Sequence, residues 1–182
     1  MLNLVIFLVV TAAIVALSWK SLKIPRSHGF FRFFAFELIL VLILLNAEHW
    51  FQELLSPRQI VSLILLTFSL LLAVHAFYLF RLLGKQGPPP RESANLEFEN
   101  TSRLITTGAY RYIRHPMYSS VLLFAWGAFL KDVSALSILV TLLASVFLYT
   151  TARVEERENV QRFGGEYGEY IKETKMFIPY LF

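Results

Sequence analysis

Long apolar runs, separated by short polar segments, dominate the pattern of residues along this chain. A helix needs about 20 apolar residues to cross the roughly 30 Å hydrocarbon core of a bilayer. Five runs approach or meet this requirement, and they cover about residues 1–19, 33–51, 59–80, 117–130 and 133–152. The fourth run is short. Only Lys131 and Asp132 separate the last two runs, which predicts a tight helical hairpin. The pattern therefore predicts an all-α membrane protein with five transmembrane helices.

The first apolar run is expected to stay in the protein as a membrane helix. No basic segment precedes it, no small-residue cleavage pattern follows it, and Lys20 and Lys23 come after it, which is unlike a cleaved signal peptide. Composition agrees with the membrane class, because 56% of the residues are hydrophobic, only 16% are charged and the mean hydropathy is +0.56.

Basic residues are concentrated in alternate connections between the apolar runs. All but two of the 17 Lys and Arg residues lie in the first loop, the third loop and the C-terminal tail; the exceptions are Arg58 and Lys131. Because Lys and Arg accumulate on the cytoplasmic side, we expect a multi-pass protein with a cytoplasmic C-terminus and a non-cytoplasmic N-terminus. The net charge of +4 then reflects topology and contact with anionic lipids, and no nucleic-acid motif is present.

Two segments outside the apolar runs have an unusual composition. The first, about residues 81–116, contains GKQGPPP, whose prolines favour an extended path, and it leads into the cationic and aromatic stretch TGAYRYIRHPMYSS. The second is the tail from about Arg153, in which VEERENVQRF has helical character, a Gly-Gly pair interrupts it, and EYGEYIKET starts another short helix. We expect loop three and the tail to fold together on the cytoplasmic face.

Pro116 marks the expected start of the fourth helix. Proline is favoured at the first helical position and disfavours helix before it, so the helix should begin near His115 or Pro116. The unpaired amides and the dipole of that first turn form an anion site, to which Arg114 and His115 add donors and Tyr110, Tyr112 and Tyr118 add aromatic faces. The alternative is that these residues are ordinary anchors at the membrane interface.

Acidic residues follow the fifth apolar run at the same interface. A carboxylate of Glu155 or Glu156 could hold a cationic amine or ribose hydroxyls. The alternative is a solvated helix face on which they pair with arginines one turn away. The chain has no cysteine, and its four histidines lack metal-ligand spacing, so thiol chemistry is excluded and no metal is expected.

A particular order of motifs connects the two segments. TTGAYRYIRHPMY is followed by a hydrophobic hairpin, by Glu-Glu at 155–156, by Phe-Gly at 163–164, and then by Tyr167, Tyr170 and Pro179. This order and spacing resemble the isoprenylcysteine carboxyl methyltransferase family and the related phospholipid methyltransferases, over about the last half of the chain. The resemblance implies a membrane helix bundle with a cytoplasmic S-adenosylmethionine site built from loop three and the C-terminal helices.

The resemblance also implies roles for individual residues. The cofactor-binding residues would be Leu104, Ile105, Tyr110, His115, Pro116, Met117, Tyr118 and Glu155. Asn95 stands where some members place a further polar contact, and Ser120 replaces a common glycine. The family's arginine for an acceptor carboxylate lies one turn before the glutamate, where this chain has Thr151, so Arg153 or else Arg114 is expected to place the acceptor.

The expected function is S-adenosylmethionine-dependent methyl transfer to a lipophilic acceptor in the membrane, with a carboxylate as the leading nucleophile. Residues 81–182 would form the methyltransferase core and residues 1–80 the acceptor-side scaffold. An amine acceptor, as in phospholipid methylation, would need a base such as Glu156, or Glu37 with His75. The third alternative is a non-enzymatic membrane adaptor or transporter. The sequence gives no signal for the natural acceptor or the oligomeric state.

Overall fold

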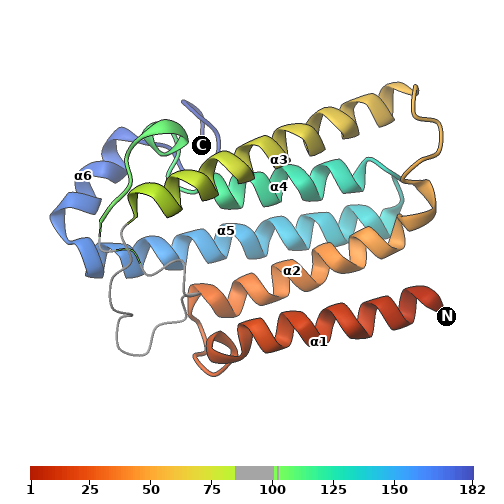
Figure 1. Ribbon diagram of the computed structural model, residues 1–182, viewed down its shortest axis with the longest axis horizontal. Coiled ribbons are helices and arrows are strands. Elements are labelled where there is room, and N and C mark those ends of the chain that lie inside the picture. Colours follow the sequence, from red (N-terminus) through yellow and green to blue (C-terminus); the bar gives the residue numbers. More distant parts are fainter. Residues whose placement is uncertain (85–100, 102) are drawn as a thin grey trace.

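The computed structural model describes residues 1–84, 101 and 103–182, and in that part of the chain the regular elements are helices. Five long helices each run opposite to the one before, and a short sixth helix crosses one end of the bundle (Figure 1). They are α1 (Leu2–Leu22), α2 (His28–Leu45), α3 (Pro57–Leu83), α4 (Pro116–Phe129), α5 (Ala135–Phe163) and α6 (Gly165–Glu173). Gly84 is described, but the rest of the GKQGPPP stretch and Asn95 lie outside the described residues.

Four of these helices, α1, α2, α3 and α5, are long and apolar enough to cross a membrane. The fourth in sequence, α4, has 14 residues. At about 1.5 Å per residue it is roughly 21 Å long, which is shorter than the hydrocarbon core. The architecture is that of a multi-pass membrane protein, whereas the count of five spans and the orientation of the termini stay predictions.

The bounds of α2 differ from the expected run at 33–51. The helix begins at His28, where the Ser27 hydroxyl accepts a hydrogen bond from the Phe30 amide at 3.2 Å, and it ends at Leu45. The hydropathy pattern did not indicate that α2 begins at His28, because the first turn of this helix mixes polar and aromatic residues. It overran the end because Trp50 and neighbouring apolar residues continue the run past the helix into the 3₁₀ turn η1 (Ala47–His49) and its loop.

The predicted start of the fourth helix and the predicted tail helix have different outcomes. The start is confirmed, since α4 begins at Pro116 with His115 as its N-cap. The VEERENVQRF segment is helical but not separate, because α5 continues through it without a break and ends at Phe163; the next residue, Gly164, has a φ of 61°. α5 therefore carries its last turns beyond the apolar bundle, next to α6 (Figure 1).

Small residues let α3 and α4 pack closely. The Ser62 hydroxyl donates to the Gly127 carbonyl and the Ser69 hydroxyl donates to the Ser120 carbonyl, each at 2.7 Å. A Cβ on Gly127 would lie only 2.9 Å from the Leu66 side chain. Interhelical contacts of this kind are typical of helices packed within a membrane, and they hold the short α4 in place against the longer α3.

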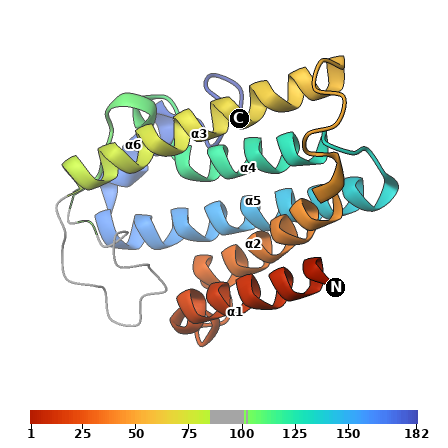
Figure 2. The same ribbon diagram turned by 45° about the vertical axis from the view of Figure 1, so that its right-hand side comes forward.

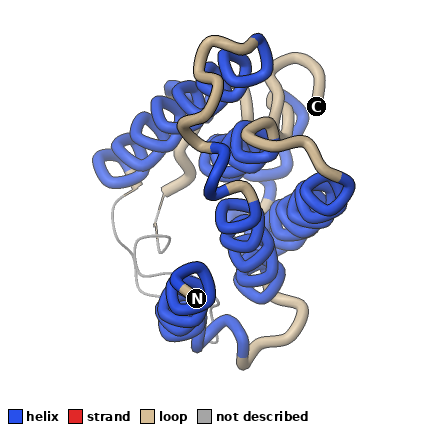
Figure 3. Tube along the Cα trace, turned by 90° about the vertical axis from the view of Figure 1, so that its right-hand side faces the viewer, coloured by secondary structure: helices blue, strands red, loops and turns tan. Residues whose placement is uncertain are grey.

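The remaining helices form the other half of the bundle. α2 packs along α5, and α1 contacts α2 at the outer edge, as the turned and end-on views show (Figures 2 and 3). The Thr11 hydroxyl on α1 donates to Glu37 on α2 at 2.7 Å. At the end opposite α6, the buried Lys131 ammonium donates to the Gln59 side chain at 2.9 Å, which holds the α4–α5 hairpin against α3.

Candidate functional site

The segment before α4 and the C-terminal tail are joined through their backbones. The Arg114 amide donates to the Lys175 carbonyl at 2.8 Å, and the His115 amide donates to the Met176 carbonyl at 3.2 Å. In return, the Lys175 amide donates to the Tyr112 carbonyl at 3.1 Å. The two segments that the sequence placed on the same side therefore meet, and together they close one end of the bundle.

A buried ion pair ties this junction to α5. Arg114 Nε lies 2.6 Å from Glu156 Oε1, and the two side chains are 8% and 7% exposed. The same guanidinium donates to the carbonyls of Ile171 and Thr174, at the end of α6. Arg114 thus connects the start of α4, the polar end of α5 and α6, and its charge is satisfied within the protein.

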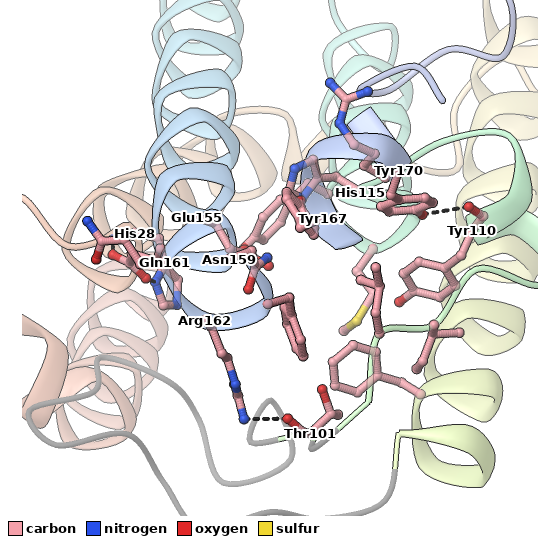
Figure 4. Close-up of a pocket in the computed structure, with 18 of the residues that line it drawn as sticks. His28, Thr101, Tyr110, His115, Glu155, Asn159, Gln161, Arg162, Tyr167 and Tyr170 are labelled. Atoms are coloured by element: carbon pink, nitrogen blue, oxygen red, sulfur yellow. Dashed lines mark hydrogen bonds and ion pairs between the residues drawn. The ribbon is translucent and has the colours of Figure 1, made fainter. Parts of the chain in front are cut away.

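A cavity of about 600 Å³ lies beside this junction, within the roughly 300–1,000 Å³ range of small-molecule sites. Its walls come from the α1–α2 loop with the start of α2, from the end of α3, from the segment before α4 with the first turn of α4, and from α5 and α6 (Figure 4). All eight residues expected to bind a cofactor line it: Leu104, Ile105, Tyr110, His115, Pro116, Met117, Tyr118 and Glu155. The structure therefore brings the whole predicted set to one cavity, and Arg114 lines it too.

The α5 wall of the cavity is rich in hydrogen-bonding groups. The Tyr118 hydroxyl donates to Glu155 Oε2. Asn159 lies one turn after Glu155 and also lines the cavity, as expected for residues four apart on one helix face (Figure 4). Arg162 donates to the Thr101 carbonyl and closes the same wall. This wall offers carboxylate and amide oxygens to a cationic or hydroxyl-bearing ligand.

Groups suited to a negatively charged ligand lie at the start of α4. His115 is 4% exposed, and its ring stacks on Tyr118 with 5.5 Å between centroids. Its Nε2 lies 3.5 Å from Glu156 Oε1, at the limit of a hydrogen bond, and no other described residue binds it. Because buried polar atoms are nearly always hydrogen-bonded, this nitrogen is suited to a ligand. The first-turn amides of α4, beginning with Met117, add the anion preference of a helix N-terminus.

Aromatic rings form much of the remaining surface. Tyr110 packs against Phe80 with 6.2 Å between centroids, and its carbonyl accepts a 2.5 Å hydrogen bond from the Tyr170 hydroxyl. Burial raises the pKa of Tyr167 and of Tyr170 above the usual range of a phenol, so both hydroxyls stay protonated. Neutral ring faces of this kind can stabilise a cation such as a sulfonium by about 0.5–2 kcal/mol each.

Arg153 does not line this cavity. It lines a second, more open hollow between α2 and α5, which we call the arginine groove: Arg26, Phe31, Tyr149, Thr150, Arg153, Val154, Arg157, Glu158 and Gln161. Arg153 Nη1 lies 3.7 Å from Glu156 Oε2, and its side chain is half exposed. The groove and the cavity share Arg26, Glu158 and Gln161, so they adjoin at the α1–α2 loop.

Part of the cavity wall carried no signal in the sequence. The first residue of α2, His28, lies on this wall: its Nδ1 is 2.5 Å from Glu158 Oε2, and its amide donates to Glu158 Oε1 at 3.2 Å. These residues are 130 positions apart, and no local pattern connects them. Asn159, in contrast, could have been found from its four-residue spacing to Glu155.

Two other residues considered as a catalytic pair have separate partners. Glu37 accepts the hydrogen bond from Thr11 on α1. His75 Nε2, on α3, accepts from the Ala109 amide at 3.3 Å, where the 3₁₀ turn η3 (Gly108–Arg111) packs against α3. His75 thus supports the turn that carries Tyr110, while Glu37 joins α1 to α2.

Comparisons with known proteins agree with this geometry. Methanethiol S-methyltransferase 1 of Bradyrhizobium diazoefficiens is 27% identical over 99 residues, which are 54% of this chain and 30% of that protein. A probable protein-S-isoprenylcysteine O-methyltransferase of Oryza sativa subsp. indica is 34% identical over 87 residues, which are 47% of this chain and 46% of that protein. The chain thus spans less than half the length of these curated relatives. No solved structure matches the chain.

A family model described as phospholipid methyltransferase matches residues 57–166. The match begins with the first residue of α3 and includes η3, α4, all of α5 and the start of α6, which are the elements that provide most of the cavity wall. Since the match covers more than half of the chain, this protein belongs to the phospholipid methyltransferase family of membrane methyltransferases.

Proposed function

We propose that this protein transfers a methyl group from S-adenosylmethionine to a lipophilic acceptor that reaches the site from the membrane. The observation that carries the proposal is the single cavity lined by all eight residues expected to hold the cofactor, with Tyr118 and Glu155 in direct contact. In this proposal, the acceptor would reach the cavity from the apolar bundle, and the water-soluble cofactor would enter at the polar end of α5.

The residues present fit the chemical groups of S-adenosylmethionine. Glu155 and Asn159 can bind its ammonium group or ribose hydroxyls, and His115 Nε2 with the first turn of α4 can bind its carboxylate. Tyr110 and Phe80 offer ring faces to its cationic centre. When bound, S-adenosylmethionine supplies an electrophilic methyl group on a sulfonium.

A carboxylate is the leading acceptor, because it needs orientation and partial desolvation but no general base. Orientation alone can supply on the order of 7–11 kcal/mol at best. Of the two cations proposed to place it, Arg114 lines the cavity, although its guanidinium already binds Glu156 and α6, so it would act by holding the wall. Arg153 lies two residues from Glu155, or roughly 200° around the helix, and therefore points away from the cavity. Arg114, and not Arg153, is therefore the proposed positioning residue.

An amine or thiol acceptor is the second candidate. Relatives named for S-methylation of methanethiol and a family described by phospholipid methylation both include acceptors other than a carboxylate. Such an acceptor loses a proton, and Glu158 with His28 forms a carboxylate–imidazole pair on the cavity wall that suits this role. Glu156 suits it less, because Arg114 and His115 already face its carboxylate.

Binding of S-adenosylmethionine to the purified full chain tests the proposal. Calorimetry should show saturable binding to the wild type and much weaker binding to Glu155→Ala. A correctly folded wild type that binds neither S-adenosylmethionine nor its demethylated product would refute the methyltransferase proposal and favour a membrane adaptor or transporter.

The acceptor class is tested separately. Membranes that contain the protein are incubated with cofactor labelled in the methyl group, and the lipid product is hydrolysed with base. A methyl ester releases volatile labelled methanol, whereas an N-methyl or S-methyl product keeps its label. Release of methanol supports the carboxylate; retention of label in the lipid supports the second candidate.

A further inference from the structure

We propose that the arginine groove binds the phosphate of an anionic membrane phospholipid, as a site separate from the methyl-transfer cavity. The proposal concerns a lipid partner of the protein and does not depend on which acceptor is methylated. It rests on the charge of the groove, on its gradient from apolar to polar, and on the direction in which it faces.

Three guanidinium groups from two separate elements line the groove. Arg153 and Arg157 stand one turn apart on the same face of α5, and Arg26 approaches from the α1–α2 loop. Arg26 has a φ of 69°, a left-handed conformation that few residues other than glycine adopt. Guanidinium groups bind phosphate through paired hydrogen bonds, which makes three of them in one hollow a suitable phosphate site.

The acidic residues near the groove leave this positive charge largely in place. Glu158 lines the groove and offsets one of the three positive charges, while its two oxygens bind the ring and the backbone amide of His28 and not a guanidinium group. Glu156 approaches Arg153 only to 3.7 Å, while its other oxygen lies 2.6 Å from Arg114 Nε. Neither Arg26 nor Arg157 has an ion pair in the part of the chain that the structure describes. The groove therefore has a net positive charge that an anion would balance.

The groove also has an apolar end and a polar end. Tyr149 lies in the apolar part of α5, and Arg157 and Gln161 lie on its last turns, in its polar part. A phospholipid has the same gradient, from acyl chain to phosphate. Basic residues at this level of a membrane attract anionic lipids at about 1 kcal/mol each. The gradient thus favours a lipid phosphate over a free anion.

The direction of the groove separates its occupant from the methyl acceptor. Arg153 and Arg157 follow each other by four residues, whereas Glu155 stands between them on the other side of α5, roughly 160–200° away. A phosphate held by the two arginines therefore faces the lipid-exposed side between α2 and α5. A lipid bound there would seat the polar half of α5, which forms a wall of the cavity, against the bilayer.

Native mass spectrometry of the full chain, with phosphatidylglycerol and phosphatidylcholine of the same acyl chains in equal amounts, tests this site without any need for methyl transfer. The wild type should retain phosphatidylglycerol in preference to phosphatidylcholine. In the double variant Arg153→Gln/Arg157→Gln, the ratio of retained phosphatidylglycerol to phosphatidylcholine should fall about fivefold for each arginine removed, or roughly 25-fold in all. The control Arg111→Gln/Lys172→Gln removes the same charge from exposed residues outside the groove and should keep the preference.

Each outcome decides the proposal. Equal retention of the two lipids by the wild type, or an equal loss of preference in both double variants, would overturn it, because the attraction would then be absent or a property of overall charge. Inorganic phosphate is added as a competitor at the lipid concentration. If it displaces phosphatidylglycerol fully, the groove is a free-anion site and the lipid assignment is wrong; persistence of the lipid adduct supports it.

Discussion

The hydroxyl of Tyr118 donates a hydrogen bond to the carboxylate of Glu155, although the two residues are 37 positions apart in the chain. Tyr118 lies in the first turn of α4, and Glu155 lies where α5 leaves its apolar segment. The contact therefore joins the RHPMY motif to the Glu-Glu motif across a single cavity. A helix N-terminus and a carboxylate that line one cavity can hold the two oppositely charged ends of one amino acid.

Replacement of Glu155 by glutamine tests that arrangement. The change keeps the shape of the side chain and removes the charge that would attract an ammonium group, and a charged hydrogen bond contributes about 1.5–3 kcal/mol. We expect the Kd for S-adenosylmethionine, measured by calorimetry, to rise roughly ten- to a hundredfold.

The matched control for this experiment is Glu169→Gln. Glu169 is 71% exposed and pairs with Lys172 on α6, away from the cavity lining. Its replacement should leave the Kd unchanged. An unchanged Kd in Glu155→Gln as well would show that this carboxylate does not bind the cofactor.

The buried pair of Arg114 and Glu156 predicts a large effect on stability. Removal of one partner leaves an uncompensated buried charge, which destabilises a protein by about 3–5 kcal/mol. We expect Glu156→Gln to lower the free energy of unfolding by that amount in denaturant titrations in detergent. Lys172→Gln, which breaks an exposed pair, should change it by about 0–1 kcal/mol. Similar small changes in both variants would mean that Arg114 finds enough other partners.

The sequence predicted those parts of the site that depend on local rules or on a known order of motifs. The start of α4 followed from Pro116, and the shared cavity followed from the resemblance that relates Tyr110, Tyr118 and Glu155. The contact of His28 with Glu158 could not be predicted, because it depends on how the start of α2 packs against α5.

Three other sequence predictions differ from the structure, each for a physical reason. Arg153 was considered for the acceptor because it lies two residues from Thr151, the position of the family's arginine; since two residues turn a helix by roughly 200°, it lines the arginine groove instead of the cavity, and its role stays a prediction. The bounds of α2 were missed because hydropathy does not record a cap such as Ser27. Apolar length alone likewise did not show that α5 continues straight through its polar segment.

Gly108 should tolerate no side chain. Its φ is 61°, and a Cβ would lie 2.5 Å from Leu79 Cδ1 and 2.8 Å from His75 Nε2. Gly108→Ala would displace His75 from the Ala109 amide and shift η3, which carries Tyr110. We expect a loss of about 1–3 kcal/mol in the free energy of unfolding and weaker cofactor binding.

Gly168→Ala is the control for this substitution. Gly168 lies within α6, and a Cβ there would contact nothing within 4 Å. Alanine in a helix interior is favoured over glycine by roughly 0.5–1 kcal/mol, so this variant should unfold at a slightly higher temperature than the wild type. A Gly108→Ala variant as stable as Gly168→Ala would show that η3 can move without disturbing α3.

Tyr170 provides a prediction about pH. Its hydroxyl donates to the Tyr110 carbonyl at 2.5 Å, and burial raises its pKa above the usual value of about 10. The folded state therefore keeps this proton at pH values where the unfolded chain releases it. The stability that results is fully present below pH about 10 and is lost as the pH rises through the folded pKa. Tyr170→Phe removes this contribution and the hydrogen bond, and it should lower the free energy of unfolding at neutral pH by about 1–3 kcal/mol.

Denaturant titrations at pH 7 and at pH 10.5 measure both effects. The loss of stability between the two pH values should be smaller in Tyr170→Phe than in the wild type, because the variant has one fewer tyrosine whose protonation is coupled to folding; Tyr167 retains its own coupling. Tyr112→Phe, at a residue that is 44% exposed, should show the wild-type dependence. Identical pH dependences in Tyr170→Phe and the wild type would mean that the Tyr170 hydroxyl titrates normally, and that its contact with the Tyr110 carbonyl does not hold that part of the cavity wall.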